Sequence, residues 1–398
     1  MIAPTSLRPR GAAFALIFFG TFPLLVTGCN KTKPERPTTS AAAPAQDESS
    51  AGKQVFRFET FGDEEFWTGT LRMNEVVETG VDPTTALAVG LKVDADALPP
   101  GILDTADLKS PATTVALLKL NAVVGLQATV DSENHITKLG ITCALCHSTV
   151  DNSVAPGIGH RKDGWPNHDL NVGKIVSLSP ALTPEQKQVY ESWGPGLYDP
   201  RYNIDGKNTP ITIPPAYGLA DIKNETYTAD GPISYWNAYV AVTQMHGQGN
   251  FSDPHLGINV THSPDLVTPK LDVLRQYQLS LPAPTAPSGS FDTAAAAHGR
   301  VVFQARCQSC HVEGNGTDNN SGVLHDPAET KMDGAYAART VNQKYRTTPL
   351  RGLWQHAPYF HDGSAATLTA VVAHYNSALG LNLSAEEQQQ LVEYLKTL

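Results

Sequence analysis

Two short stretches of the chain place two cysteines three positions apart, with a histidine directly after the second cysteine. They are Cys143-Ala144-Leu145-Cys146-His147 and Cys307-Gln308-Ser309-Cys310-His311. Thiols at this spacing add to the two vinyl groups of a porphyrin, and the adjacent imidazole reaches the iron. A short disulfide or a zinc site could use the cysteines, but neither requires a histidine after both pairs. The pattern predicts two covalently bound haem c groups, with His147 and His311 as iron ligands.

The fifth cysteine, Cys29, lies in a different context. Arg8 and Arg10 precede an apolar run over residues 12–26, which is shorter than the ~20 residues of a membrane span and predicts a secretory signal. Residues 25–29, Leu-Val-Thr-Gly-Cys, resemble the lipobox of bacterial lipoproteins, in which the cysteine is lipidated. We expect residues 1–28 to be a lipoprotein signal peptide and residues 29–52 a disordered tether. The protein would then be exported and lipid-anchored to a membrane facing the periplasm.

The charge of the chain argues against a nucleic-acid partner. The full sequence carries 29 basic and 39 acidic residues, and its net charge is −10. Loss of residues 1–28 would remove Arg8 and Arg10 and no acidic residue, which makes the chain more negative. Nucleic acid is therefore an unfavourable partner, whereas an acidic face suits either solubility or the steering of basic redox proteins.

Local signals predict the elements that deliver the two motifs. A hairpin of residues 127–130 and 135–142 leads into the first motif, and a helix is expected over residues 114–124. Thr183-Pro184-Glu185-Gln186 is typical of a capping box, so a helix is expected over residues 184–193. A helix over residues 293–306 leads into the second motif, and a last helix begins at Ser384, where Glu387 completes a capping box.

An internal repeat indicates two domains. Leu274-x-x-Tyr277-x-x-Ser280-Leu281 matches Leu391-x-x-Tyr394-x-x-Thr397-Leu398, and each copy follows a haem motif on an expected helix. Residues 282–290 contain only Pro, Ala, Thr, Ser and Gly, a linker composition. The expected fold is mainly α, with two c-type cytochrome domains over residues 53–283 and 291–398, loop-rich insertions, a leading extension before the first motif and a small β hairpin.

The C-terminal part resembles a known family. Thr347-Thr348-Pro349-Leu350-Arg351, followed by residues 357–364 (Ala-Pro-Tyr-Phe-His-Asp-Gly-Ser) and Ala366-Thr367-Leu368, is similar to the signature of the bacterial dihaem cytochrome c peroxidase superfamily. That superfamily includes the enzymes that mature the tryptophylquinone of methylamine dehydrogenase, and dihaem oxygenases. The resemblance is closest over residues 292–398 and looser over 138–283, and it does not cover residues 53–137.

The resemblance implies a sixth ligand for the second haem. In the peroxidases a methionine stands fourteen positions after the signature histidine, which is His361 here. That count reaches Tyr375, as in the maturation-type members, where a tyrosine ligates the iron. His374 is a rival and Met332 a weaker one, and Tyr375 could also be an ordinary aromatic residue on a helix face.

For the first haem, Gly157-Ile158-Gly159-His160-Arg161 resembles the loop that holds a removable distal histidine in the peroxidases. The resemblance implies His160 as that ligand, with His168 as the rival. Trp236 lies where the family places a tryptophan between the haems, which implies an electron relay, and the alternative is an indole of the core.

One departure bears on catalysis. The peroxidases use a glutamate beyond that tryptophan to move protons, whereas this chain has Asp253-Pro254-His255-Leu256-Gly257. Ordinary peroxidase activity is therefore in question. His255 is the expected proton carrier and His246 the second choice, because imidazole titrates near neutral pH. Both could equally be solvated loop histidines.

Together these observations predict a periplasmic dihaem oxidoreductase of the peroxidase type. The first haem would react with peroxide or dioxygen, and the second would relay electrons from a redox partner protein such as a small cytochrome or cupredoxin. The alternatives are a dihaem electron carrier without catalysis and an oxygenase that acts on an organic substrate.

Overall fold

The computed structural model describes residues 45–398, which form one compact unit. The predicted signal peptide, Cys29 and residues 30–44 of the predicted tether lie outside the described residues. The last part of that tether is not disordered, because residues 45–52 belong to the first helix. Within the described part of the chain, no helix combines the length and the apolar character needed to cross a bilayer.

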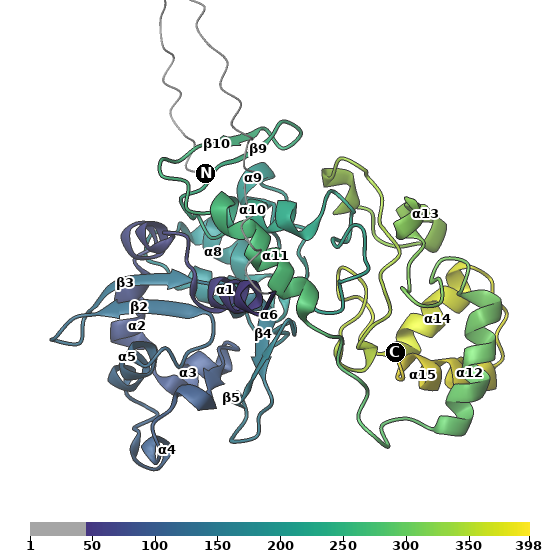
Figure 1. Ribbon diagram of the computed structural model, residues 1–398, viewed down its shortest axis with the longest axis horizontal. Coiled ribbons are helices and arrows are strands. Elements are labelled where there is room, and N and C mark those ends of the chain that lie inside the picture. The colour runs from purple at the N-terminus through teal and green to yellow at the C-terminus, as the bar shows by residue number, and fades with distance from the viewer. Residues whose placement is uncertain (1–44) are drawn as a thin grey trace, which may run out of the picture. The chain divides into compact units, whose positions relative to one another are not determined.

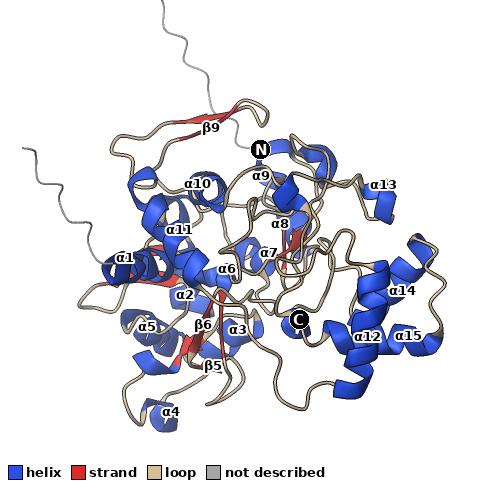
Figure 2. Ribbon diagram, turned by 45° about the vertical axis from the view of Figure 1, so that its right-hand side comes forward, coloured by secondary structure: helices blue, strands red, loops and turns tan. Residues whose placement is uncertain are grey.

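The described residues are rich in helices (Figure 2), many of them short. The α-helices are α1 (Ala45–Phe58), α2 (Met73–Gly80), α3 (Pro83–Ala88), α4 (Ile102–Thr105), α5 (Pro111–Lys119), α6 (Ala144–His147), α7 (Val172–Ser177), α8 (Pro184–Glu191), α9 (Tyr202–Asp205), α10 (Ile233–Thr243), α11 (Leu271–Ser280), α12 (Thr293–Arg306), α13 (Pro327–Thr330), α14 (Leu368–Ala378) and α15 (Ala385–Leu395). A π-helix, η1 (Glu65–Thr70), and five 3₁₀ turns complete them: η2 (Ala95–Ala97), η3 (Thr268–Lys270), η4 (Asn319–Ser321), η5 (Ala337–Arg339) and η6 (Leu353–Gln355).

The strands of the described residues form small two-stranded sheets and no larger one. The sequence predicted a single hairpin, β2–β3, and the other strands are too short to show an alternating pattern. The pairs are β1 (Val93–Asp94) with β5 (Ile158–Gly159), β2 (Leu126–Val130) with β3 (Ile136–Ile141), β4 (Ser148–Val150) with β6 (Arg161–Asp163), β7 (Leu197–Tyr198) with β8 (Ile211–Thr212), and β9 (Phe251–Asp253) with β10 (Ile258–Val260). The pair β1–β5 is parallel, and the other four are antiparallel.

The internal repeat corresponds to two similar helix crossings. Helix α1 packs against α11, and α12 packs against α15. In the first crossing Gly52 lies against Val273 and Tyr277, and in the second Gly299 lies against Gln390 and Tyr394. Helices α12 and α15 lie beside α14 in the C-terminal part of the chain (Figure 1). Along the sequence, the two helices of each crossing lie on either side of one haem motif.

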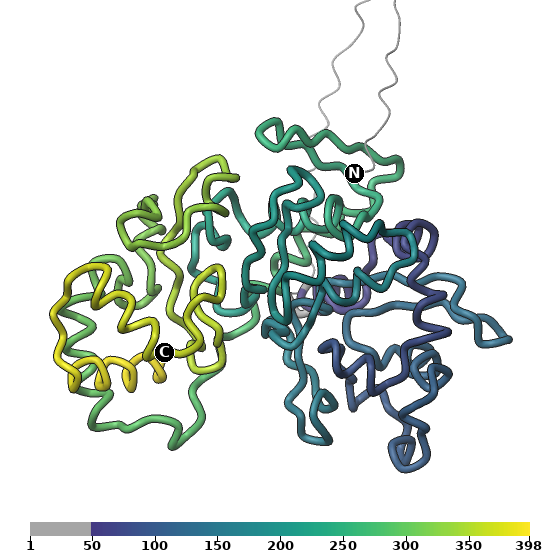
Figure 3. The backbone as a smooth tube through the Cα atoms, turned by 180° about the vertical axis from the view of Figure 1, so that it is seen from behind, coloured from purple at the N-terminus to yellow at the C-terminus, as the bar shows by residue number. Residues whose placement is uncertain are grey.

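Hydrophobic side chains form three buried clusters. Two of them draw on residues 56–277, and the third, which includes Phe303, Leu353, Val372 and Leu391, draws on residues 303–395. Long loops connect these parts, as the backbone trace in Figure 3 shows. The helix-rich character agrees with the expected mainly α fold, and the division into two cytochrome domains stays a prediction.

Several local predictions are confirmed. Thr183 and Gln186 form the expected capping box at α8, as do Ser384 and Glu387 at α15. Helix α12 spans the predicted residues, and Asp292 caps it. The helix expected over residues 114–124 is displaced, because α5 begins at Pro111 and ends at Lys119, five residues early.

Candidate functional site

The first haem motif follows directly from the β2–β3 hairpin. Strand β3 ends at Ile141, and the motif then forms the single turn α6, in which the His147 N–H donates to the Cys143 carbonyl over 3.1 Å. Gly125 lets the hairpin approach this turn, because a Cβ there would lie 2.2 Å from the Leu145 Cα atom. The positive φ of Gly125, 81°, favours glycine as well. The hairpin therefore sets the position of both thiols.

The imidazole of His147 is oriented as an iron ligand requires. Its Nδ1 lies 3.0 Å from the Pro214 carbonyl oxygen, which accepts a hydrogen bond and leaves Nε2 for a metal. Metal-bound histidines commonly donate their second ring N–H to such a carbonyl. Burial lowers the pKa of His147 to about 4, so the ring is neutral at pH 7, the form that binds iron.

The second motif repeats this arrangement after α12. The His311 N–H donates to the Cys307 carbonyl over 3.0 Å, and Nδ1 of His311 lies 3.3 Å from the Gly316 carbonyl oxygen. Burial lowers the pKa of His311 too. The two histidines thus share one geometry although they come from different parts of the chain.

The four cysteines of the motifs fit thioether attachment better than the alternatives. All four are free thiols, so neither pair forms a disulfide. Burial raises the pKa of Cys143 and Cys146 to about 12 and that of Cys307 to about 11, so these thiols are neutral in the folded chain. All four cysteines are half-buried. The residues present therefore fit haem c.

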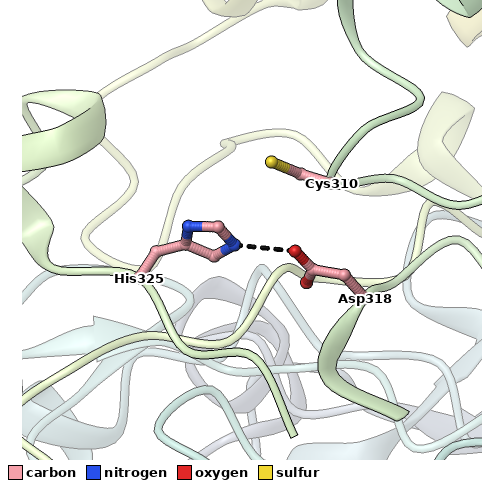
Figure 4. Close-up of side chains that lie close together, drawn as sticks. All are labelled: Cys310, Asp318 and His325. Carbon is pink, nitrogen blue, oxygen red and sulfur yellow. Dashed lines mark hydrogen bonds and ion pairs between the residues drawn. The ribbon is translucent and has the colours of Figure 1, made fainter. Parts of the chain in front are cut away.

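Beside the second motif, Cys310, Asp318 and His325 lie close together (Figure 4), with candidate ligand atoms within 4.8 Å of one another. His325 Nε2 is 2.9 Å from Asp318, and Nδ1 is 3.0 Å from Glu329. Burial opposes the charge on His325, but these two partners outweigh it and raise the pKa. Because Cys310 belongs to a haem motif, we interpret the remaining residues as an ion-pair cluster next to that motif.

Tyr375 lies close to the second motif. It is on α14, and Phe360 of the family-like signature packs edge-on against it at 5.9 Å. Burial, and to a smaller extent the charges of Cys307 and Cys310, raise the pKa of Tyr375 to about 12. The imidazole of His374 already has a hydrogen-bond partner, since its Nε2 lies 2.8 Å from the Thr330 carbonyl oxygen.

The other rival for that position, Met332, is half-buried just after α13. The hydrogen bond of His374 to Thr330 favours Tyr375 over that rival, and the role of Tyr375 as a ligand stays a prediction.

The two histidines predicted as distal ligands of the first haem differ in position. His160 is exposed, and Nδ1 lies 2.8 Å from Asp96. His168 is half-buried, and burial lowers its pKa although the Ala357 carbonyl lies close enough to accept a hydrogen bond. It also neighbours His356 of the C-terminal part. The contact with Asp96 at the surface makes His160 the less favourable ligand. Both assignments stay predictions.

The two candidate proton carriers, His255 and His246, differ in the contacts that their rings make. His255 is exposed in the turn between β9 and β10. His246 stacks on Phe66 at 3.6 Å, with its outer face exposed, and this packing lowers the pKa of the imidazole. It follows Met245, which is buried in the same hydrophobic cluster that Cys143 contacts. His255 precedes Leu256, which packs against the same cluster, so this contact does not distinguish the two histidines.

Trp236 also packs against this hydrophobic cluster. It lies on α10, and its ring is 5.1 Å from the Tyr239 ring. This position suits either a relay or a core indole, so its role stays a prediction.

Three further features of the described residues were not predicted. Arg339 is buried and binds Asp199 at 2.9 Å and Asp205 at 2.8 Å, across more than 130 residues of sequence. The carboxyl of Asp63 is fully buried next to β3, and burial raises its pKa to about 9. The third is a group of aromatic rings on either side of β7: Tyr190, Trp193, Tyr198 and Tyr202. The density of aromatic residues over 190–202 was the one signal in the sequence.

Comparisons with known proteins agree with the family-like signature. A model of the RoxA-like, cytochrome c-like family matches residues 344–376, which include the signature and Tyr375. The cytochrome c peroxidase IdrP2 of Pseudomonas sp. (strain SCT) is 33% identical over 146 residues, which cover 27% of this chain and 40% of that protein. The match thus spans less than half of the relative. The predicted resemblance to the dihaem cytochrome c peroxidase superfamily is confirmed, and with it a haem c cofactor.

Two solved structures match part of the chain at low structural similarity. One is hydrazine synthase from Kuenenia stuttgartiensis, with a TM-score of 0.34 and 18% identity over 48% of this chain and 73% of that one. The other is a MauG-like protein associated with microbial copper homeostasis, with a TM-score of 0.35 and 20% identity over 48% of this chain and 74% of that one.

Proposed function

We propose that this relative of the dihaem cytochrome c peroxidases is an exported dihaem oxidoreductase that reduces peroxide with electrons from a redox partner protein. One observation carries the proposal: His147 and His311 follow paired cysteines and present the same geometry, with Nδ1 held by a backbone carbonyl. Bound haem would supply iron that exchanges electrons and binds peroxide. The peroxide follows from the relative, which is a cytochrome c peroxidase.

Different residues would serve the two haem sites. His147 and His311 would hold the two irons, the backbone carbonyls orient the two imidazoles, and burial keeps both rings neutral. Tyr375 would offer its phenolic oxygen to the second iron, and such a ligand would favour electron transfer at that site.

The candidate ligands of the first site are the loop histidines His160 and His168, and a weakly held histidine would leave that iron open to peroxide. His255, or His246 as the second choice, would accept a proton and return it.

The cellular location is part of the proposal. A lipid on Cys29 would hold the folded body at a membrane on the periplasmic side, within reach of a small cytochrome or cupredoxin. The Cys29→Ser protein should be released from membranes into the soluble fraction, while a Ser40→Ala control should remain bound. Equal membrane binding of both would place the anchor elsewhere.

The enzyme and the electron-carrier alternatives differ in the spin state of the irons. Denatured protein should retain two haems per chain, measured by mass spectrometry. In the ferric or half-reduced protein, one haem should be high-spin, bind cyanide and react with hydrogen peroxide. Two low-spin haems that refuse cyanide in every redox state would instead identify an electron carrier.

A further inference from the structure

Four aromatic rings form a continuous group beside the first haem motif, in which Trp193 is buried and the three tyrosines are half-buried. The ring centroids of Tyr198 and Trp193 are 5.5 Å apart, those of Trp193 and Tyr190 4.9 Å, and those of Tyr190 and Tyr202 5.4 Å, all edge to face. We propose that these four residues conduct electrons from a small phenolic reductant at the surface to the first haem. This inference rests on the proposed peroxide reaction.

The inner end of the group is Tyr198, on β7. It packs in the same region as Cys146, and the Cys146 thiol is close enough to influence its ionisation. Its hydroxyl donates to the Gln244 side-chain oxygen over 2.5 Å. A haem attached through Cys146 would therefore have Tyr198 as an aromatic neighbour.

The middle of the group is Trp193, which is 3% exposed. Its indole N–H donates to the Asn208 side-chain oxygen over 2.7 Å. This neutral acceptor holds the indole in place without taking its proton, so Trp193 can lose and regain an electron while it keeps the N–H. Trp193 also contacts Tyr202 directly, with centroids 6.0 Å apart.

The outer end consists of Tyr190 on α8 and Tyr202 on α9, both half-buried. Figure 2 shows α8 and α9 in the same part of the molecule as α6, which carries the first motif. Tyrosine and tryptophan are among the side chains most easily oxidised by one electron, whereas phenylalanine or leucine could supply the packing but not the hydrogen bonds of Trp193 and Tyr198. The composition of the group therefore favours conduction over packing alone.

The electrons balance with peroxide as the oxidant. Hydrogen peroxide takes two electrons and two protons, its O–O bond breaks, and two molecules of water form. Each electron leaves an outer tyrosine through Trp193 and Tyr198, and the tyrosine gives up its phenolic proton. Each tyrosyl radical then takes one hydrogen atom from a phenol, so two phenols become two phenoxyl radicals for each peroxide consumed.

The test begins with the holoprotein and hydrogen peroxide without a reductant. Rapid freezing and electron paramagnetic resonance should reveal a tyrosyl or tryptophanyl radical, and peptide mass spectrometry should locate oxidation at Tyr190 or Tyr202. Trp193→Phe and Tyr198→Phe should each lower the oxidation of Tyr190 and Tyr202 about tenfold per peroxide consumed, as a barrier increase of ~1.4 kcal/mol would.

A second experiment uses hydroquinone as the reductant. The Tyr190→Phe/Tyr202→Phe protein should oxidise hydroquinone about tenfold more slowly than the wild type.

Tyr227→Phe is the matched control, because Tyr227 is half-buried, hydrogen-bonds to Thr212 of β8, and pairs with no other ring among the described residues. It should leave the pattern of oxidation unchanged. Haem content and circular dichroism of each variant show whether it has folded.

If peroxide reacts but the oxidised residues are the same in wild type, Trp193→Phe and Tyr198→Phe, the conduction path is wrong and the proposed function stands. If folded holoprotein does not react with peroxide, both are wrong.

Discussion

A methyl group on Gly52 of α1 would lie 2.1 Å from the carbonyl oxygen of Val273 on α11, so the two helices touch through their backbones at this point. Gly299 of α12 has the same relation to Gln390 of α15, at 1.9 Å. No larger residue fits either position without moving a helix. This close contact is the structural basis of the sequence repeat.

We expect Gly52→Ala to destabilise the protein by about 1–3 kcal/mol, because the added Cβ would overlap backbone atoms that cannot move aside. Thermal or denaturant unfolding of the holoprotein measures the change. Gly80→Ala in α2 is the control, because no atom lies within 4 Å of its Cβ position. That substitution should be neutral or slightly stabilising. Equal effects of the two changes would show that the α1–α11 contact is looser than described.

Tyr375→Phe should change the ferric spectrum and spin state of the second haem while haem content stays constant. The phenyl ring preserves packing against Phe360, but it has no oxygen to offer iron. Visible absorption and electron paramagnetic resonance measure the effect. Tyr394→Phe, which retains the contact with Phe303, is the control. If the spectrum does not change, Tyr375 is a packing residue, and His374→Ala then tests the rival ligand.

Asp63 should make stability fall as pH rises. In the unfolded chain its carboxyl ionises near pH 4, whereas burial holds the proton in the folded protein up to about pH 9. Between these values the folded state binds the extra proton, so the free energy of unfolding falls by at most about 1.4 kcal/mol per pH unit.

Asp63→Asn should remove this dependence while an amide oxygen still faces the Ile141 N–H. The difference in melting temperature between variant and wild type should grow from pH 5 to pH 8. Asp104→Asn, at an exposed position, should show no such trend. A constant difference across this range would mean that Asp63 is already ionised in the folded protein.

Arg339→Met should destabilise the protein by about 3–5 kcal/mol, because it leaves the buried carboxylate of Asp199 without its cation. Adding Asp199→Asn should recover part of the loss. Arg300→Met, which breaks an exposed pair with Glu313, should cost less than about 1 kcal/mol. Denaturant unfolding compares the three proteins, and similar losses for Arg339→Met and Arg300→Met would refute a buried ion pair.

The sequence by itself determined the features that depend on near neighbours along the chain. The spacing of Cys143, Cys146 and His147 defines a haem motif within five residues, and a capping box such as Thr183 with Gln186 closes within one helical turn. The hairpin that leads into the first motif was also predictable, because alternating strands and a short turn are local signals.

The tertiary structure alone decided which side chains meet. His160 pairs with Asp96 at the surface, 64 positions away, rather than lying in an interior position, and Arg339 reaches Asp199 across 140 positions. Tyr198 neighbours Cys146 in the same way. Such contacts depend on how loops close and how helices cross, and burial then sets the charge of each group. No pattern within a few residues specifies how these loops close and these helices cross. The residues that contact the haem motifs could therefore be identified only in the folded chain.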